Sequence, residues 1–433
     1  MRYRSLKGRA PVADFREATL VGQAPDGGLY FPEYIPRWDG SLTASDATTD
    51  MHEAAFRVMR PYVGDVIPER DLQDIVADTL SFQTPLVRID ERVSALELHH
   101  GPTLAFKDMG ARFMSRCLGH FAKGMEERVF VLVATSGDTG GAVAQAFMGV
   151  EGVEVVILYP SGKVSPVQEK QLSTAGGNIH ALEVKGDFDA CQRLVKRAFA
   201  DEELKDRLFM TSANSINVAR WLPQQLYYLS AWRQWSEAER PPVVSVPSGN
   251  FGNLCAGLMA WKSGLPVGLF IAACNLNDTV PRFLREGVYH PRPSVATVSN
   301  AMDVSDPSNF IRILEIFGRD SLSMKDIVES VSIGEEETLD AISRVSSEHD
   351  YLMDPHGAVG YLALMRRLER HPEEKGYFLE TAHPVKFPDS VETATGQKVE
   401  LPAQLKTLMA LPKKALPLEP EYEAFRDLLL RLS

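Results

Sequence analysis

The 433-residue sequence is long enough for two or three domains of about 100 to 200 residues each, and its 44% hydrophobic and 24% charged residues are typical of globular proteins. Its 46 basic and 58 acidic residues give a net charge of -12, which repels polyanions and argues against nucleic acid as a partner. No run of about 18 apolar residues occurs, so we expect no membrane span and no membrane partner.

The cysteines and the first residues predict a cytoplasmic protein. The four cysteines are scattered and never form a C-x-x-C pair, so neither a zinc knuckle nor a disulfide framework is expected; they are Cys117, Cys191, Cys255 and Cys274. No secretion signal is expected either, because no apolar run follows the basic residues of MRYRSLKGRAPVADF.

Residues 1–90 differ from the rest of the chain in their pattern of turns and helical stretches. Turns rich in proline and glycine, such as QAPDGGLYFPEYIPRWDG, alternate with helical stretches such as ATTDMHEAAFRVMRPYV. No glycine-rich loop follows a strand there. We therefore expect a small N-terminal domain over residues 1–90 and a larger α/β region over residues 91–433.

A single lysine, Lys107, lies in the apolar stretch HGPTLAFKD, residues 100–108. One interpretation is a surface lysine at the start of a helix, where Asp108 would favour the N-terminus. The other is a partly desolvated amine, because Phe106 precedes the lysine and a Gly-Pro turn lies upstream. Desolvation lowers the pKa of a lysine and frees its nucleophilic lone pair. These nine residues leave both interpretations open.

The order strand, glycine loop, helix occurs twice downstream. The first unit is RVFVLVA (residues 128–134), TSGDTGG and AVAQAFMG; the second is a strand over residues 243–246, SGNFGN and LCAGLMAWKSG. Between them, VEVVILYP predicts another strand, and SPVQEKQLSTAGG predicts a helix with Ser165 as N-cap and Gln168 completing a capping box. The pattern predicts two α/β lobes with mainly parallel sheets, whose two loops face a shared cleft.

The second loop is the better candidate for binding a phosphate. Gly249 and Gly252 can adopt positive φ, so that successive backbone N–H groups converge at a helix N-terminus. A tight turn with glycines needed only for packing is the alternative. The loop lacks the lysine of a P-loop and the spacing of G-x-G-x-x-G, which disfavours an ATPase and a Rossmann dehydrogenase.

Polar side chains elsewhere could hold a substrate. Ser136 and Thr139 offer hydroxyl groups, and Asp138 offers a carboxylate suited to an amine or a hydroxyl of a substrate. The alternative is that this loop is only a tight turn needed for packing. In NSINVAR, Asn217 and Arg220 would share a helix face, with the guanidinium suited to a phosphate or carboxylate. A solvated helix face is the alternative there, and the nearby Pro223 would interrupt a helix interior.

The histidines suggest no metal site. Four histidines are candidates for metal ligands, and none has the spacing of a metal site, so a structural or proton-transfer role is the simpler interpretation. These are His99, His100, His356 and His383. A nucleophilic lysine and a phosphate cradle have one joint explanation, which is pyridoxal 5′-phosphate held as a Schiff base by Lys107 and through its phosphate by the SGNFGN loop.

The whole sequence resembles the threonine synthases of the longer bacterial and fungal type. The resemblance rests on an ordered set of motifs, among them DGGLYFPEYIP, HGPTLAFKD, TSGDTG, QEKQLSTAGGNI, GDFDACQ, NSINVAR, VPSGNFGN, NDTVPRFL, NAMDVSDPSN and ETAHPVKF. It implies a fold type II pyridoxal-phosphate enzyme, similar to the tryptophan synthase β subunit. The implied lyase reaction converts O-phospho-L-homoserine and water to L-threonine and phosphate, the last step of threonine biosynthesis.

The resemblance also implies roles for individual residues. Lys107 corresponds to the catalytic, cofactor-bearing lysine, and Thr381 to the hydroxyl that faces the pyridine nitrogen. The other residues implied for the cofactor are Gly249, Asn250, Phe251, Gly252 and Asn253, and those implied for the substrate are Ser136, Asp138, Thr139, Asn217 and Arg220. We expect the two lobes to close over the substrate, in a monomer or a homodimer.

Two other functions are compatible with parts of the sequence. A related pyridoxal-phosphate dehydratase or phospholyase would share the lysine and the glycine loop. A binding protein without catalytic activity could share the scaffold, but would be expected to lose the lysine, which this sequence retains.

Overall fold

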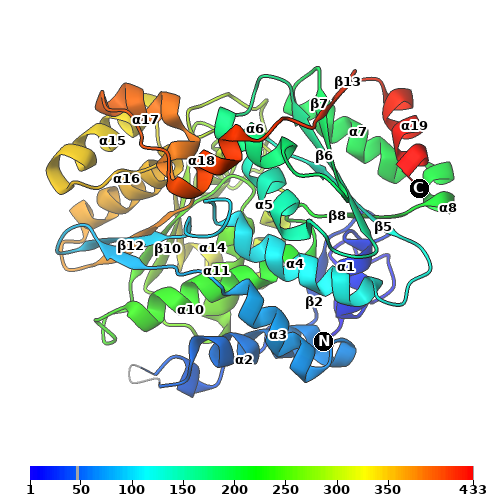
Figure 1. The fold of residues 1–433 in the computed structure, drawn as a ribbon. Coiled ribbons are helices and arrows are strands. Elements are labelled where there is room, and N and C mark those ends of the chain that lie inside the picture. The colour runs from blue at the N-terminus through cyan, green and yellow to red at the C-terminus, as the bar shows by residue number, and fades with distance from the viewer. Residues whose placement is uncertain (45–47, 433) are drawn as a thin grey trace.

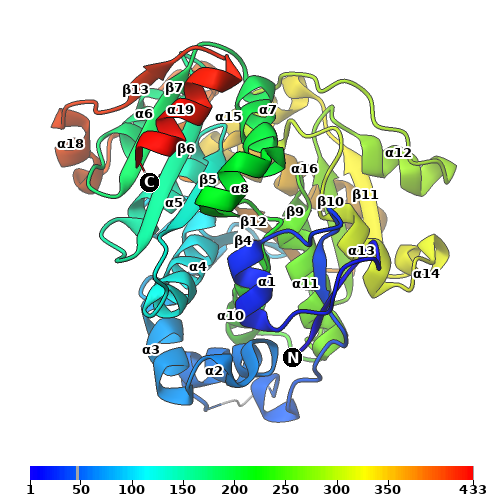
Figure 2. The ribbon, with the colours of Figure 1, turned by 90° about the vertical axis from the view of Figure 1, so that its right-hand side faces the viewer.

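The computed structural model describes residues 1–44 and 48–432. Apolar, β-branched runs of the sequence form two central sheets, and helices cover both faces of each (Figures 1 and 2). This arrangement is the predicted pair of α/β lobes. Among the described residues, every helix is too short or too polar to cross a membrane.

The five-stranded sheet is parallel throughout and has the order β13-β7-β6-β5-β8. Its strands are β5 (Val129–Ala134), β6 (Val153–Pro160), β7 (Ile179–Val184), β8 (Phe209–Ser212) and β13 (Leu416–Leu418). The helices around it are α4 (Lys107–Ala122), α5 (Asp138–Phe147), α6 (Pro166–Ser173), α7 (Phe188–Ala200), α8 (Glu202–Arg207) and α19 (Tyr422–Leu432).

Alternate residues of β5 explain why that strand is apolar along its whole length. Val131 and Val133 pack in a buried cluster with α4 and α5, whereas Phe130 and Leu132 pack in another with α7 and α19. The strand is therefore buried on both faces, as the sequence predicted.

The six-stranded sheet has the order β11-β10-β9-β12-β4-β3, in which only β3 runs antiparallel to its neighbour. Its strands are β3 (Leu86–Arg88), β4 (Val93–Glu97), β9 (Val243–Pro247), β10 (Leu269–Cys274), β11 (Val328–Ser332) and β12 (Gly376–Glu380). The helices of this part of the chain are α10 (Gln225–Gln234), α11 (Gly252–Ser263), α12 (Thr279–Glu286), α13 (Phe310–Ile316), α14 (Ser321–Lys325), α15 (Glu335–His349), α16 (Pro355–Arg370), α17 (Pro388–Thr395) and α18 (Ala403–Ala410).

The N-terminal segment shares its hydrophobic core with the first lobe. It contains β1 (Tyr3–Ser5), β2 (Tyr30–Pro32), α1 (Phe15–Val21), α2 (Met51–Val63) and α3 (Glu69–Thr79), with β1 and β2 pairing as a short antiparallel ribbon. The rings of Phe15 and Phe113 lie 6.4 Å apart, which joins α1 to α4. Buried Arg312 of α13 also joins the segment to the rest of the chain, because its guanidinium donates to the carbonyl of Tyr30 in the segment and to that of Ser215 outside it.

The helix predicted after Ser165 forms as α6, with both hydrogen bonds of the capping box. Gln168 N–H donates to Ser165 Oγ at 3.3 Å, and Ser165 N–H donates to Gln168 Oε1 at 3.0 Å. The helix ends at Ser173, with Thr174 as its C-cap. The four cysteines are free and buried.

Candidate active site

The predicted strand-loop-helix units position the two glycine loops at the carboxyl ends of β5 and β9. The TSGDTG loop leads from β5 into α5, and the SGNFGN loop leads from β9 into α11. In the first loop, Gly137 has a φ of 138°, a conformation that favours glycine, and the hydroxyl of Thr135 accepts from the N–H groups of Gly137 and Gly140 at 3.0 and 2.9 Å. These two hydrogen bonds fix the shape of the loop.

In the SGNFGN loop, the left-handed residue is Phe251, with a φ of 61°, and neither Gly249 nor Gly252 has positive φ. The expectation of positive φ at the two glycines was therefore wrong. Gly249 is needed for close approach instead, because a Cβ there would lie 2.7 Å from the Cα of Met302 and 2.9 Å from the carbonyl of Ala301.

Asparagines hold the SGNFGN loop in place. Asn250 Nδ2 donates to Ser215 Oγ at 2.7 Å, and Asn250 Oδ1 accepts from the N–H of Ser308 at 2.7 Å. Asn253 lies in the first turn of α11, where its Oδ1 accepts from the hydroxyl of Tyr228. Its buried Nδ2 has no hydrogen-bond partner within the described part of the chain, which leaves a donor for a ligand.

Lys107 is the first residue of α4 and is half-buried. Its Nζ lies 4.3 Å from the centroid of the Phe106 ring. Burial lowers the pKa of Lys107 to about 8, with a further contribution from the positive charge of Arg220. Of the two interpretations left open by the sequence, the structure supports the desolvated amine.

Asp108 explains how the turn before Lys107 is held. Its buried carboxylate accepts from the N–H of Thr103 at 2.9 Å and from the Thr103 hydroxyl at 2.6 Å. Gly101 packs against the same carboxylate, where a Cβ would collide with it. Asp108 thus stabilises the turn in addition to placing a negative charge in the first turn of α4.

Lys386 was missed by the sequence analysis, although it lies in the motif ETAHPVKF. Its fully buried Nζ forms a 2.8 Å ion pair with Asp138 Oδ1 and donates to the carbonyl of Thr103 at 2.8 Å. Burial alone would raise the pKa of Asp138, but Lys386 and the hydrogen bond from Gln168 lower it below its ordinary value. The available signal was a lone lysine in the short apolar stretch HPVKF, similar to that of Lys107 in LAFKD.

The pairing with Lys386 changes the interpretation of Asp138. The carboxylate of Asp138 already forms an ion pair with Lys386 and accepts a hydrogen bond from Gln168, which fixes the loop. We therefore no longer expect it to bind a substrate amine directly. Ser136 and Thr139 differ from it, because both are only half-buried and their hydroxyls make no hydrogen bond to other described residues. These two hydroxyls stay candidates for contacting a substrate.

Arg220 is 3% exposed, yet its Nε and Nη1 have no hydrogen-bond partner among the described residues. Burial lowers the pKa of Arg220 to about 10, a value at which the guanidinium is still charged near neutral pH. The charge of Asp108 raises this pKa, but no ion pair joins Asp108 to Arg220 among the described residues, so the buried guanidinium lacks a direct anionic partner that a ligand would supply. The site therefore has a place for an anion.

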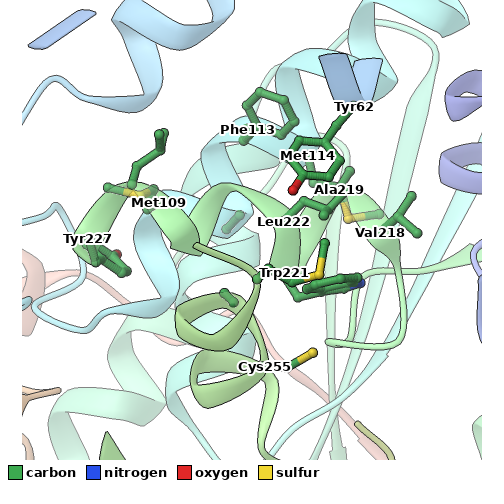
Figure 3. Packing of buried hydrophobic residues seen from close by; sticks show 14 of the residues in the cluster. Tyr62, Met109, Phe113, Met114, Val218, Ala219, Trp221, Leu222, Tyr227 and Cys255 are labelled. Atoms are coloured by element: carbon green, nitrogen blue, oxygen red, sulfur yellow. The ribbon is translucent and has the colours of Figure 1, made fainter. Parts of the chain in front are cut away.

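The segment that carries Arg220 packs tightly on α4. Arg220 lies in α9 (Val218–Trp221), which continues through the 3₁₀ turn Leu222–Gln224 into α10, so that Pro223 falls in the turn and does not break a helix interior. Met109, Phe113 and Met114 of α4 join the apolar cluster with Val218 and Trp221 of α9 (Figure 3). Gly110 permits the approach, because a Cβ there would strike the carbonyl of Arg220.

Asn217 does not fit the substrate role expected from the sequence. It is fully buried as the N-cap of α9, where its Oδ1 accepts from the N–H of Ala219 at 3.0 Å. Its Nδ2 donates to the carbonyls of Thr19 and Ser212 at 2.8 and 3.2 Å. Both groups of the amide already form hydrogen bonds within the protein, so we expect Asn217 to position α9 and not to contact the substrate directly.

Thr381 directly follows β12 and lies beside the lysine segment. Its carbonyl accepts from the N–H of Phe106 at 2.9 Å, and Ala105 and Ala382 form an isolated β-bridge. The Thr381 hydroxyl makes no hydrogen bond to other described residues. The chain thus places Thr381, which is 6% exposed, beside the segment that carries Lys107, and its role toward the ring nitrogen stays a prediction.

These residues fit the expected cofactor. A primary amine of lowered pKa suits an aldehyde, while the buried unpartnered Nδ2 of Asn253 at the N-terminus of α11 suits a phosphate. The unpartnered guanidinium of Arg220 provides for a second anion. The site can therefore hold a phosphorylated aldehyde together with an anionic substrate.

Known families match along the whole chain. Residues 78–379 match the family described as pyridoxal-phosphate dependent enzyme, residues 2–80 match threonine synthase N terminus, and residues 357–429 match threonine synthase, C-terminal. The threonine synthase of Serratia marcescens is 46% identical over 435 residues, which cover 100% of both chains.

Two solved structures have the same fold over the same length. The crystal structure of threonine synthase from Escherichia coli has a TM-score of 0.92 at 43% identity and covers 100% of both chains. The pyridoxal-phosphate-bound threonine synthase of Brucella melitensis has a TM-score of 0.92 at 36% identity, over 100% of this chain and 99% of that one.

Proposed function

The chain belongs to the threonine synthase family of pyridoxal-phosphate-dependent enzymes, and from that premise we propose how its own residues carry out the reaction. The enzyme is a lyase that forms L-threonine and phosphate from O-phospho-L-homoserine and water. The alternative of a related dehydratase or phospholyase is not favoured by the relatives. The observation that carries our proposal is the unpartnered, buried guanidinium of Arg220 near the amine of Lys107.

The cofactor would be held at three points. The SGNFGN loop and Asn253 would bind its phosphate, Lys107 would bind its aldehyde carbon, and the hydroxyl of Thr381 would face the ring nitrogen. When bound, pyridoxal phosphate delocalises the negative charge that develops beside the substrate's amino group. A hydroxyl, unlike a carboxylate, does not hold the ring nitrogen protonated.

We assign the substrate's phosphate to Arg220. Its planar guanidinium can donate two parallel hydrogen bonds to one phosphate. Ser136 and Thr139 would add neutral donors from the TSGDTG loop, while the pair Asp138–Lys386 keeps that loop against Thr103. Because phosphate is the leaving group, these donors would also stabilise the charge that grows as the bond to it breaks.

Lys107 would move the protons. As a free amine, once the substrate's own amino group occupies the aldehyde carbon in its place, Nζ would accept the proton from the Cα of the substrate and act again at Cβ, since one amine on one side of the substrate reaches both carbons. An amine with a pKa of about 8 is suited to this exchange near neutral pH. Closure of the two lobes would exclude water until it adds at Cβ.

The substrate is tested by comparing products. Incubation with O-phospho-L-homoserine should release threonine and phosphate in equal amounts, with little ammonia. Incubation with threonine or serine should give little keto acid. Ammonia and a keto acid from threonine or serine, without threonine from O-phospho-L-homoserine, would instead identify a dehydratase.

The pH dependence of Lys107 in the apoenzyme gives a second test. Because burial lowers the pKa of Lys107 to about 8, its neutral fraction should rise about fivefold from pH 7 to 8 and less than twofold from pH 8 to 9. An ordinary lysine, with a pKa of about 10.4, should gain nearly tenfold over each of these intervals. Acetylation with limiting acetic anhydride, read by peptide mass spectrometry, measures Lys107 against exposed lysines in the same sample. A parallel rise for all of them would contradict the desolvated amine.

Gly249→Ala should weaken the binding of pyridoxal phosphate. The new Cβ would press on the backbone of Met302 and Ala301, and overpacking of this kind costs about 1 to 3 kcal/mol. We expect a roughly 5- to 150-fold higher dissociation constant in a spectroscopic titration of the apoenzyme. Gly40→Ala is the matched control, because no atom lies within 4 Å of its Cβ position. Equal affinities for both variants would argue against the SGNFGN loop as the phosphate site.

We propose that the enzyme works in the cytoplasm as a monomer or a homodimer. Four free, buried cysteines are compatible with a reducing compartment. Size-exclusion chromatography with light scattering tests the assembly, and a mass of four or more chains would contradict it.

A further inference from the structure

A second group of chemically active side chains lies at the end of β4, outside the proposed catalytic site. It consists of Glu97, His99 and His100, each of which offers one ligand atom within 4.8 Å of the other two. His100 Nε2 lies 2.6 Å from Glu97 Oε2. His99 is 8% exposed, whereas the side chain of His100 is 41% exposed, so the group reaches from the interior to solvent.

His100 forms an ion pair with Glu97, but no such pair accounts for the buried His99. Its buried Nδ1 has no hydrogen-bond partner within the described part of the chain, although buried polar atoms are nearly always paired. Its ring lies between those of His100, at 4.8 Å, and His383, at 5.3 Å. A neutral imidazole with a free ring nitrogen is the form that binds metals.

The surroundings of Glu97 support a bound cation. The hydroxyl of Tyr351 donates to Glu97 Oε1 at 3.0 Å, a contact that would orient a ligating carboxylate. His383 is outside the group whose ligand atoms lie within 4.8 Å of one another, and its Nδ1 accepts from the N–H of Val385 at 3.1 Å. The donor set is therefore two imidazoles and one carboxylate.

We propose that Glu97, His99 and His100 bind a divalent transition-metal ion of the zinc class, with water as the fourth ligand. Two imidazole nitrogens and one carboxylate oxygen are ligands that Zn²⁺ prefers. Tetrahedral ligands at about 2.0 to 2.2 Å from zinc lie about 3.4 Å from one another, so His100 Nε2 and Glu97 Oε2, now 2.6 Å apart, would separate slightly around the ion. Metal binding at these three residues is independent of the reaction that the enzyme catalyses.

A bound ion would connect the end of β4 to the turn that precedes Lys107. His100 directly precedes Gly101, which packs on Asp108, and the same turn contains Thr103, whose carbonyl holds Lys386. Metal binding would therefore stabilise the segment that positions the catalytic lysine, and we expect it to raise the melting temperature of the holoenzyme.

Calorimetric titration with ZnCl₂ tests the site, using untagged holoenzyme first treated with a chelator. We expect one Zn²⁺ per chain at micromolar or lower dissociation constant. His100→Ala removes an exposed ligand without opening the core and should weaken binding on the order of 100-fold, whereas Tyr351→Phe should weaken it about tenfold. His371→Ala is the control, since His371, Glu373 and Glu374 form another group of possible ligands.

The thermal unfolding of the same proteins gives an independent measurement. Zn²⁺ should raise the melting temperature of the wild-type and His371→Ala proteins, and leave that of His100→Ala unchanged. Three results would overturn the proposal: no saturable binding to the wild type, unchanged affinity in His100→Ala, or loss of binding in His371→Ala.

Discussion

Replacing Lys107 with alanine should lower kcat for threonine formation by more than about 1,000-fold, because one amine both anchors the cofactor and moves the protons of the substrate. The fold should be unaffected, since Lys107 is half-buried and its Nζ contacts the Phe106 ring without forming an ion pair. The visible absorption band of the bound cofactor should disappear with the activity. Steady-state assays and absorption spectra of the purified proteins measure both effects.

Two further variants make the Lys107 experiment specific. Lys107→Arg retains a positive charge but cannot bind the aldehyde, so it should be as inactive as Lys107→Ala. Lys123→Ala, at the exposed end of α4, should retain full activity. A Lys107→Ala protein that still forms threonine, or that still traps the cofactor on borohydride reduction, would assign the role to another lysine, with Lys386 the first candidate.

The features predictable from sequence were those set by local pattern. Fully apolar runs such as residues 129–134 predicted strands buried on both faces, and Ser165 with Gln168 predicted the start of a helix. Lys107 and the two glycine loops were found because their local sequences are unusual. Each signal lies within about ten residues, which is the range over which strand, loop and helix preferences act.

What the sequence did not predict depends on partners distant in the chain. Asp138 pairs with Lys386, and Asn217 bonds to Thr19, so neither role follows from a local motif. The positive φ of the SGNFGN loop lies at Phe251 and not at its glycines, so the glycine pattern did not locate it. The histidines were judged by their mutual spacing, which gave no metal site; the structure adds Glu97, and this carboxylate leads us to propose one.

Replacing Arg220 with methionine should lower kcat/KM for O-phospho-L-homoserine and raise protein stability at the same time. Loss of a buried, charged partner to the substrate's phosphate costs about 2 to 5 kcal/mol, or roughly 30- to 5,000-fold in kcat/KM. In the free enzyme the same guanidinium has Nε and Nη1 without partners among the described residues and only the more distant charge of Asp108 beside it, so an apolar side chain of similar length removes a poorly compensated buried charge. The melting temperature should therefore stay the same or rise.

This combination separates a binding role from a structural one. If Arg220 served mainly to hold α9 in place, Arg220→Met would lose stability and activity together. Inorganic phosphate provides the decisive measurement: at about 100 times its dissociation constant it should stabilise the wild type by about 2.7 kcal/mol and have no such effect on Arg220→Met. Arg292→Met, at an exposed position, should respond to phosphate as the wild type does. Equal stabilisation of all three proteins would place the substrate's phosphate elsewhere, because the unpartnered guanidinium would then have no ligand of this kind.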